Sequence, residues 1–186
     1  LQEKSGNCTV LEVNHPILTG VDLLKIRNLD QPGFKAREIS LLYYKNTSLV
    51  KALDQLNITM DRAAAEGCNI IILTDRGVDE NHMPIPSLLA VSSVEEHLVR
   101  TKKRTAVSLI LESGEPRDTH QLAMLIAYGA RAVCPYLAHA VIWENLSPNA
   151  IENYNQALTA GVLKIASKMG VSTLQAYQSA QLFEAV

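Results

Sequence analysis

Residues 69–74, with the sequence NIIILT, decide the fold class. Four consecutive aliphatic residues without alternation are typical of a strand that is covered on both faces, which occurs mainly in parallel sheets. The preceding residues fit this interpretation, because Ser48 can cap a helix whose apolar residues recur every three or four positions until Gly67. The pattern therefore predicts a helix followed by a buried parallel strand.

Three further segments have the apolar composition of short strands. They cover residues 38–44, 105–111 and 130–135. Helical periodicity is found between them at residues 86–98 and 117–128. The strand starts lie about 25 to 36 residues apart, which is the length of a strand–crossover–strand unit. The sequence therefore predicts an α/β fold with a parallel sheet built from βαβ units. An incomplete (β/α)-barrel and an open sheet fit this pattern equally well.

The two ends of the chain differ from this alternation. Residues 1–35 are interpreted as an N-terminal extension packed on a single α/β domain that comprises residues 36–186. Thr19 can cap a short helix within this extension. The C-terminal part of the domain is expected to be helical, with helices at residues 136–146, 148–161, 162–169 and 172–185 and breaks at Gly161 and Gly170.

Several side chains are expected to have structural rather than chemical roles. Trp143 and the apolar residues Tyr136, Leu137 and Val141 are expected in the core. The three cysteines, Cys8, Cys68 and Cys134, have neither a metal-binding nor a redox spacing, so they are interpreted as reduced thiols. The five histidines lack the spacing of metal ligands, and we predict no metal site.

Charge and hydropathy exclude several classes of partner. The 186 residues contain 17 Lys and Arg against 19 Asp and Glu, which gives a net charge of −2. This balance does not favour binding to nucleic acid or to an anionic membrane surface. No apolar run approaches the length of a membrane span, roughly 18 to 20 residues. We therefore expect neither nucleic acid nor a membrane as a partner.

Candidate site residues follow two neighbouring strands of the predicted sheet. Asp75 and Arg76 come directly after residues 69–74, and four more follow residues 105–111, namely Glu112, Glu115, Arg117 and His120. Loops at the carboxyl ends of parallel strands carry the sites of α/β proteins. One hypothesis is a site for a small anion or carboxylate, in which Asp75, Glu112 and Glu115 act as acids and Arg117 holds the anion. The structural interpretation is favoured over it, because the same groups can cap helices and pair with one another without any ligand.

Four phrases of the sequence resemble the central domain of the large subunit of glutamate synthase. They are DRGV at residues 75–78, IPSLLA at 85–90, ESGEPRDTHQLAMLIAYGARAVCPYLA at 112–138, and NYNQALTAGVLKIASKMGVSTLQAYQSAQLFEAV at 153–186. The resemblance extends from residue 14 to residue 186, in order along the chain. Chance similarity of one short motif does not explain a match of this length.

The resemblance implies a role in glutamate biosynthesis and ammonia assimilation. Glutamate synthase is an oxidoreductase that converts glutamine and 2-oxoglutarate into two glutamates, with an amidotransferase domain that releases ammonia and an FMN-binding domain that reduces the iminoglutarate. The central domain is implied to position these two domains and to help wall the ammonia tunnel, without catalytic residues of its own. FMN and an iron–sulfur cluster are implied for the parent enzyme, and no cofactor for this fragment.

The resemblance also implies where the neighbouring domains dock. Lys164, Lys168 and Gln181, in the final helices, are expected to contact the FMN-binding domain. The fragment alone is expected to be inactive and could self-associate through apolar surface after Pro135. The parent enzyme is expected in the cytoplasm, or in the plastid stroma if it is of the plant type. The alternative is an independent binding site for a small anion or carboxylate at the strand ends.

Overall fold

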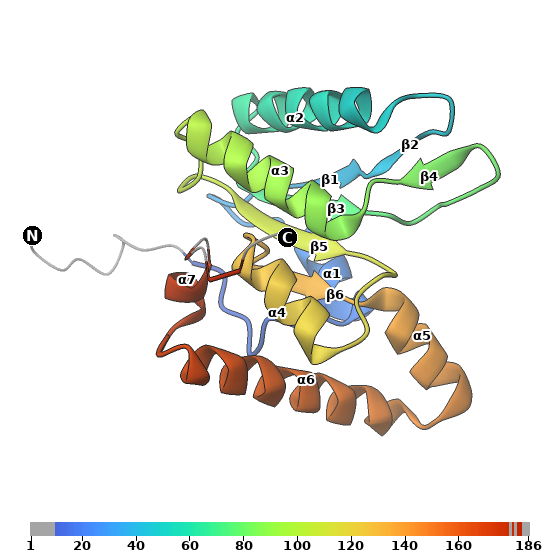
Figure 1. Ribbon diagram of the computed structural model, residues 1–186, viewed down its shortest axis with the longest axis vertical. Coiled ribbons are helices and arrows are strands. Elements are labelled where there is room, and N and C mark those ends of the chain that lie inside the picture. The colour runs from blue at the N-terminus through green and yellow to red at the C-terminus, as the bar shows by residue number, and fades with distance from the viewer. Residues whose placement is uncertain (1–9, 179, 181, 184–186) are drawn as a thin grey trace, which may run out of the picture.

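A parallel sheet forms the centre of the fold. The computed structural model describes residues 10–178, 180, 182 and 183. In this part of the chain, four parallel strands form the sheet (Figure 1). In order across the sheet they are β1 (Ala36–Ser40), β3 (Ile70–Thr74), β5 (Ser108–Glu112) and β6 (Ala132–Cys134). The predicted α/β class with a parallel sheet is therefore confirmed.

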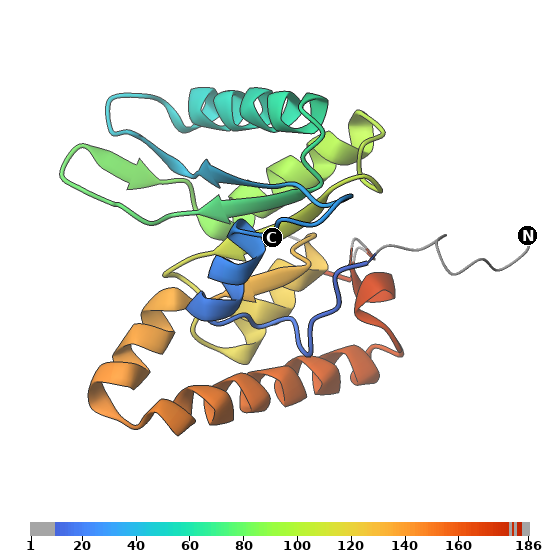
Figure 2. The same ribbon diagram turned by 180° about the vertical axis from the view of Figure 1, so that it is seen from behind.

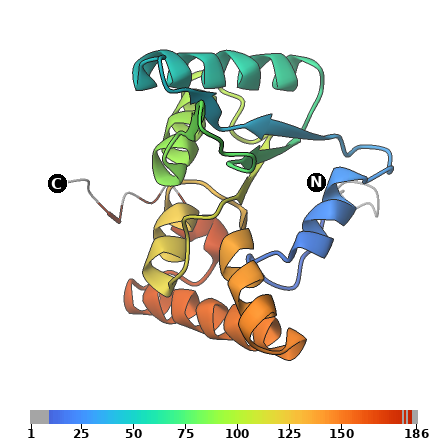
Figure 3. The same ribbon diagram turned by 90° about the vertical axis from the view of Figure 1, so that its right-hand side faces the viewer.

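Helices cover both faces of this sheet. The helices that connect successive strands lie next to one another on one face, and they are α2 (Leu49–Ala65), α3 (Ser87–Arg100) and α4 (Thr119–Ala127). The opposite face is covered by α1 (Gly20–Arg27), which precedes the first strand (Figure 2, Figure 3). Thr19 caps α1 as predicted, because its hydroxyl oxygen accepts a hydrogen bond from the backbone N–H of Asp22.

The aliphatic run in β3 follows from this arrangement. Successive side chains of a strand point to opposite faces of the sheet. Ile70 and Ile72 therefore belong to the core beneath α1, whereas Ile71 and Leu73 belong to the core beneath α2, α3 and α4. Full burial of one such side chain stabilises a fold by about 1.5–3 kcal/mol. Because both faces are covered, neither set of positions accepts a polar residue at low cost.

The position of the crossover helices distinguishes the two architectures that fit the sequence. An open doubly wound sheet carries helices from its crossovers on both faces, whereas a (β/α) barrel carries them on the outside only. Here α2, α3 and α4 share one face, so the sheet is an incomplete barrel. Backbone hydrogen bonds cover its β6 edge, from Val133 N to Pro16 O and from Leu18 N to Val133 O, each 2.8 Å long.

The strand predicted at residues 38–44 is two strands. After Ser40 the chain leaves the sheet, and β2 (Leu42–Tyr44) pairs in antiparallel fashion with β4 (His82–Pro84). The segment between β3 and α3 therefore contains a strand. The reason is that β3 ends at Thr74, so the backbone groups of residues 42–44 have no partner in the main sheet and bond to residues 82–84 instead.

The helices after β6 differ from the prediction at Gly161. α5 (Tyr136–Asn145) is followed by α6 (Pro148–Lys168), which continues through Gly161 without the predicted break. The glycine serves close packing against α4 instead. A β-carbon at this position would lie 2.5 Å from Cγ2 of Thr119. The glycine therefore allows α6 to lie directly against the start of α4.

The last predicted helix is much shorter than expected. α7 covers Leu174–Tyr177, and Gln178 already has an extended backbone. Tyr177 is fully buried, and Nε2 of Gln178 donates a hydrogen bond of 2.8 Å to the carbonyl oxygen of Ala130. This anchoring ends the helix. The prediction of a helix over residues 172–185 is therefore wrong for the described residues that follow Tyr177.

The expected core position is wrong for three of the four apolar residues in α5. Leu137 is 50% exposed, Val141 52% and Trp143 61%, whereas Tyr136 is half-buried and packs against the core beneath α1. α5 packs against α6, and its buried residue is His139. Leu137 and Val141 lie on the side of the helix opposite His139, which explains their exposure.

We predict that Gly161→Ala destabilises the protein although alanine favours helices. Overpacking at a close contact costs about 1–3 kcal/mol, which exceeds the gain in helix propensity of about 1 kcal/mol. Urea unfolding should show a net loss of about 1 kcal/mol, which is a central cost of about 2 kcal/mol less the gain of about 1 kcal/mol. The control is the same change in a Thr119→Ala background, which removes the clashing Cγ2 and Oγ1 atoms. An equal loss in both backgrounds would contradict the proposed contact.

Candidate functional site

A buried carboxylate lies at the carboxyl end of β5. Glu112 is 1% exposed, and three side chains donate hydrogen bonds to it. Oε2 accepts from Nη2 of Arg27 at 2.6 Å and from Oγ1 of Thr74 at 2.7 Å. Oε1 accepts from Nε of Arg76 at 2.6 Å. Glu112 thus connects the end of α1 to the ends of β3 and β5.

The charge of Glu112 is stabilised by these donors. Burial alone would raise the pKa of its carboxyl group, but the hydrogen bonds from Arg76 and Thr74 and the positive charges of Arg76 and Arg27 outweigh burial and lower the pKa. Arg27 also pairs with Glu38, in β1, at 2.6 Å. The ionised form of Glu112 is therefore held by groups of the chain itself.

Asp75 lies beside this network and has its own donors. It is 4% exposed, and its Oδ2 accepts a hydrogen bond of 2.6 Å from Oγ of Ser113. The backbone N–H of Gly114 donates to both of its carboxylate oxygens, at 3.2 and 3.1 Å. These bonds tie the loop after β3 to the loop after β5.

Tyr136, the first residue of α5, completes the cluster. The guanidinium carbon of Arg76 lies 3.8 Å from the centroid of its ring, a cation–π contact. Burial and the negative charge of Asp75 raise the pKa of Tyr136 to about 12. The hydroxyl group therefore remains protonated over the physiological range, so it can donate a hydrogen bond but does not act as a base.

Glu115 has a different structural role. Its carboxylate accepts hydrogen bonds from Oγ and, at 3.0 Å, from the backbone N–H of Ser87 at the start of α3. The capping position of α3 is occupied by Pro86, whose side chain makes no capping hydrogen bond. A helix N-terminus needs a hydrogen-bond acceptor for its free N–H groups. Glu115, which is 28 positions from Ser87 in the sequence, supplies that acceptor.

The remaining candidates lie outside this cluster. Arg117 is exposed, and His120 contacts the ring of Phe183 edge-on and lines a cavity of about 300 Å³ between α3 and α4. Lys164 and Lys168 are exposed on α6, and Gln181 lies outside the described residues. The structure thus brings together Asp75, Arg76 and Glu112. Arg117 and His120 instead contact Gln121, Tyr154 and Phe183.

Sequence reasoning missed four members of the cluster. Arg27 comes from a helix 85 positions away along the chain, and no local pattern marks it. Thr74 and Ser113 were signalled only by their positions next to strand ends. Tyr136 follows β6 directly, so the same rule that selected Asp75 and Glu112 could have selected it.

The described residues offer little for metal or thiol chemistry. No group of three or more His, Cys, Asp or Glu side chains among them is arranged to hold a metal ion. Cys68 and Cys134 are buried free thiols, and Cys8 lies outside the described residues. Burial and the charge of Glu112 raise the pKa of Cys134 to about 12, so this thiol is not a ready nucleophile. None of the helices placed by the structure is long and apolar enough to cross a membrane.

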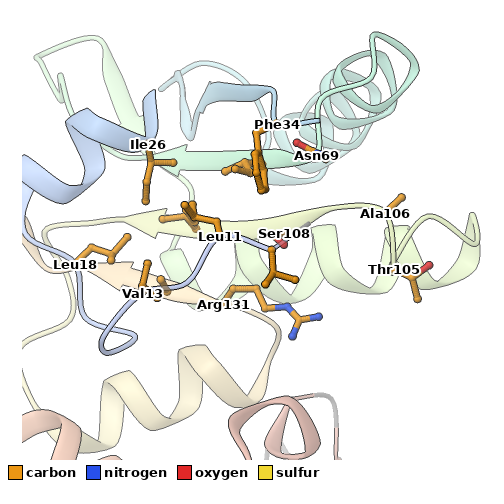
Figure 4. Close-up of a pocket in the computed structure, with 14 residues that line it drawn as sticks. Leu11, Val13, Leu18, Ile26, Phe34, Asn69, Thr105, Ala106, Ser108 and Arg131 are labelled. Carbon is orange, nitrogen blue, oxygen red and sulfur yellow. The ribbon is translucent and has the colours of Figure 1, made fainter. Parts of the chain in front are cut away.

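A larger cavity lies at the opposite end of the sheet. It has a volume of about 410 Å³ and lies where β3 and β5 begin, as shown by Asn69 and Ser108 in its wall (Figure 4). Leu11, Ile26 and Phe34 line it from the N-terminal segment and α1. This cavity is therefore predominantly apolar near α1 and separate from the cluster around Glu112.

Known proteins similar to this chain have a consistent description. Residues 1–186 match the family described as the glutamate synthase central domain. The large chain of NADPH glutamate synthase from Bacillus subtilis is 36% identical over 194 residues, which cover all of this chain and 13% of the relative. NADH glutamate synthase from Schizosaccharomyces pombe is 35% identical over 201 residues, and ferredoxin-dependent glutamate synthase 2 from Synechocystis is 36% identical over 210 residues. Both matches cover all of this chain. They cover 10% of the Schizosaccharomyces pombe relative and 13% of the Synechocystis relative.

Solved structures that are similar in shape are flavoenzymes with barrel folds. The L230A mutant of flavocytochrome b2 with benzoylformate has a TM-score of 0.57 at 13% identity, over 70% of this chain and 35% of that chain. DHODH from Eimeria tenella in complex with ferulenol has a TM-score of 0.52 at 15% identity, over 80% and 38% of the two chains. At these identities the likeness concerns the fold, and it agrees with an incomplete barrel. From its sequence matches along the full length, the chain belongs to the glutamate synthase central domain family.

Proposed function

We propose that this chain is a non-catalytic connecting domain that positions the amidotransferase and FMN-binding domains of a glutamate synthase and helps to wall its ammonia tunnel. One observation carries the proposal. The carboxylates of Asp75, Glu112 and Glu115, the acids that could act on a substrate at the strand ends, all accept hydrogen bonds from the chain itself. Groups used in this way rigidify loops and are not poised for acid–base chemistry.

The length of the relatives supports a role within a larger polypeptide. The chain spans 10–13% of the length of the curated relatives it matches. Relatives named for NADPH, NADH and ferredoxin match it with 35–36% identity. Equal similarity to enzymes with different electron donors is expected of a domain that does not take part in recognition of the donor.

The remaining parts of the proposal concern cofactors, compartment and domain boundaries. We assign FMN and the iron–sulfur cluster of the parent enzyme to its other domains. We assign the parent enzyme to the cytoplasm or to the plastid stroma. Residues 1–35 are treated as an extension packed on residues 36–186, which is supported by the contacts of α1 with β1. Lys164 and Lys168 are candidates for contacts with the FMN-binding domain, since both are exposed on α6.

An independent anion or carboxylate site at the strand ends is the weaker alternative. Arg76 is already bound through Nε to Glu112, and the hydrogen bonds of Arg117 among the described residues are to Gln121 and Tyr154 instead. Such a site would have to use the basic groups without the acids, because the acids are engaged. It therefore accounts for fewer of the contacts than the structural role does.

We predict that Glu112→Gln destabilises the protein by about 2–3 kcal/mol at pH 7, because the neutral amide cannot replace the charge-assisted hydrogen bonds that the buried carboxylate accepts from Arg27 and Arg76. The pKa of Glu112 is lowered in the folded state. The ionised carboxylate therefore contributes its full stabilisation of the fold above the ordinary pKa of 4.5, and this stabilisation is lost as the pH falls below that value. The difference between wild type and variant should therefore shrink between pH 5 and pH 3 in urea unfolding. Glu38→Gln is the control, since Glu38 binds the same arginine but is 46% exposed. A difference that stays constant down to pH 3 would contradict the assigned charge.

The proposed function predicts loss of coupling in the complete parent enzyme. Glu112→Gln should raise the amount of free ammonia released per glutamate formed from 2-oxoglutarate several-fold, because loosened loops no longer hold the two domains in register. Glu38→Gln should leave this ratio unchanged. The measurement is the simultaneous assay of ammonia and glutamate. If Glu112→Gln lowers stability but leaves the ratio at the wild-type value, the positioning role is wrong.

A further inference from the structure

An exposed apolar helix face lies next to the Glu112 cluster. Leu137 and Val141 in α5 are each at least half exposed, and Ala140 is exposed as well. Ala140 and Val141 follow Leu137 by three and four positions, so all three share one side of the helix. Figure 1 shows α5 beyond the carboxyl ends of the strands, with α6 on one side. We call Leu137, Ala140 and Val141 the α5 face.

Such a face is unusual for a helix at a protein surface. Surface helices normally carry polar residues on their outward side, and a helix that is apolar all round is buried. The inward side of α5 packs against α6 through His139, whose Nε2 donates a 2.8 Å hydrogen bond to Oδ1 of the fully buried Asn155. Since the inward side is occupied, the apolar outward side is available for a second contact.

Arg76 extends this face with a fixed positive charge. Its guanidinium lies on the ring of Tyr136 and is bound through Nε to Glu112, yet the side chain is 50% exposed. Its terminal amino groups make no hydrogen bond to any residue that the structure describes. A guanidinium held in place loses little conformational freedom on binding, and its paired amino groups match a carboxylate.

The loop after β5 joins Arg76 and the α5 face into one surface. A β-carbon on Gly114 would lie 3.2 Å from Oη of Tyr136 and 3.5 Å from Cβ of Leu137. Gly114 therefore fits closely against the first turn of α5, and Asp75 holds its backbone N–H in place. Arg76, Tyr136 and Leu137 are thus adjacent parts of one surface, in which the guanidinium of Arg76 lies beside apolar side chains.

We propose that the α5 face and Arg76 dock another domain of the same polypeptide, through an apolar surface that carries a carboxylate for Arg76. This inference rests on the proposed function and names the surface that performs it. About nine-tenths of the length of the relatives lies outside the chain, so the polypeptide supplies ample surface to cover this face. Aromatic, aliphatic and arginine side chains around a central contact are the composition of a strong interface.

The test measures accessibility in the complete parent enzyme. Val141→Cys and, as a control on α2, Val50→Cys are labelled with a maleimide, and the labelled peptides are quantified by mass spectrometry. Each rate is compared with the rate of the same cysteine in the urea-unfolded chain. Val141 is 52% exposed in this domain, so strong protection must come from outside it. We expect Val141→Cys to be protected at least about tenfold and Val50→Cys less than about threefold.

Three results would overturn the proposal. Protection of Val141→Cys below about threefold would mean that nothing covers the face. Protection that disappears on dilution would mean that a second copy of the chain covers it. Protection that is lost when a free dicarboxylate or phosphate is added would mean that Arg76 serves a small anion. Protection that survives all these conditions supports docking within the polypeptide.

The carboxylate for Arg76 has a separate test with a matched control. Arg76→Gln and Arg27→Gln each remove one donor to Glu112, but Arg27 lies at the end of α1 and pairs with Glu38. Arg76→Gln should accelerate the labelling of Val141→Cys at least about fivefold, and Arg27→Gln should not. Equal effects of both variants would contradict a carboxylate on the docked domain. Labelling does not depend on turnover, so the two proposals can fail separately. If Val141→Cys is protected but Glu112→Gln leaves the ratio of ammonia to glutamate unchanged, the docking surface is retained and the coupling role is wrong.

Discussion

The burial of one ionised carboxylate constrains the whole strand-end region. Glu112 cannot remain charged at 1% exposure without donors, and these come from α1, from the end of β3 and from the loop after it. The same requirement holds α1 against the sheet, since Arg27 bonds to both Glu112 and Glu38. The ring of Tyr136 then lies against Arg76, and Asp75 bonds to Ser113 in the neighbouring loop. The geometry of this end of the sheet is therefore set by electrostatic neutralisation as much as by packing.

An incomplete barrel must cover the face that a closed barrel would enclose. In this chain the N-terminal segment does so, with Leu18, Leu23 and Ile26 packed on Ile70, Ile72 and Ile110. The strand edge at β6 is paired with residues 16–18, which protects backbone groups that would otherwise remain exposed. The fold thus resembles flavoenzyme barrels in its strands and crossover helices while α1 occupies the inner face.

Local pattern was sufficient for much of the fold, and contacts between distant residues explain the rest. The buried strand at residues 69–74 and the cap at Thr19 depend on neighbouring residues, and both were predicted. Gly161 suggests a helix break to any local rule, and only Thr119, 42 positions earlier, shows why the helix continues. The strand-end rule found Asp75, Arg76 and Glu112 but not Arg27, which lies 85 positions from Glu112. Trp143 was misplaced because apolar character alone does not determine whether a side chain is buried.

The central claim is that Glu112 holds α1 on the sheet and so fixes the strand-end surface. Hydrogen exchange of the amide groups in α1, compared between wild type and Glu112→Gln with α3 as the internal reference, tests it most directly. The account predicts at least about tenfold faster exchange at Leu23 and Ile26 in the variant, with a much smaller change at Val91 and Val94 in α3. Exchange that is unchanged in α1, or accelerated equally in both helices, would contradict it.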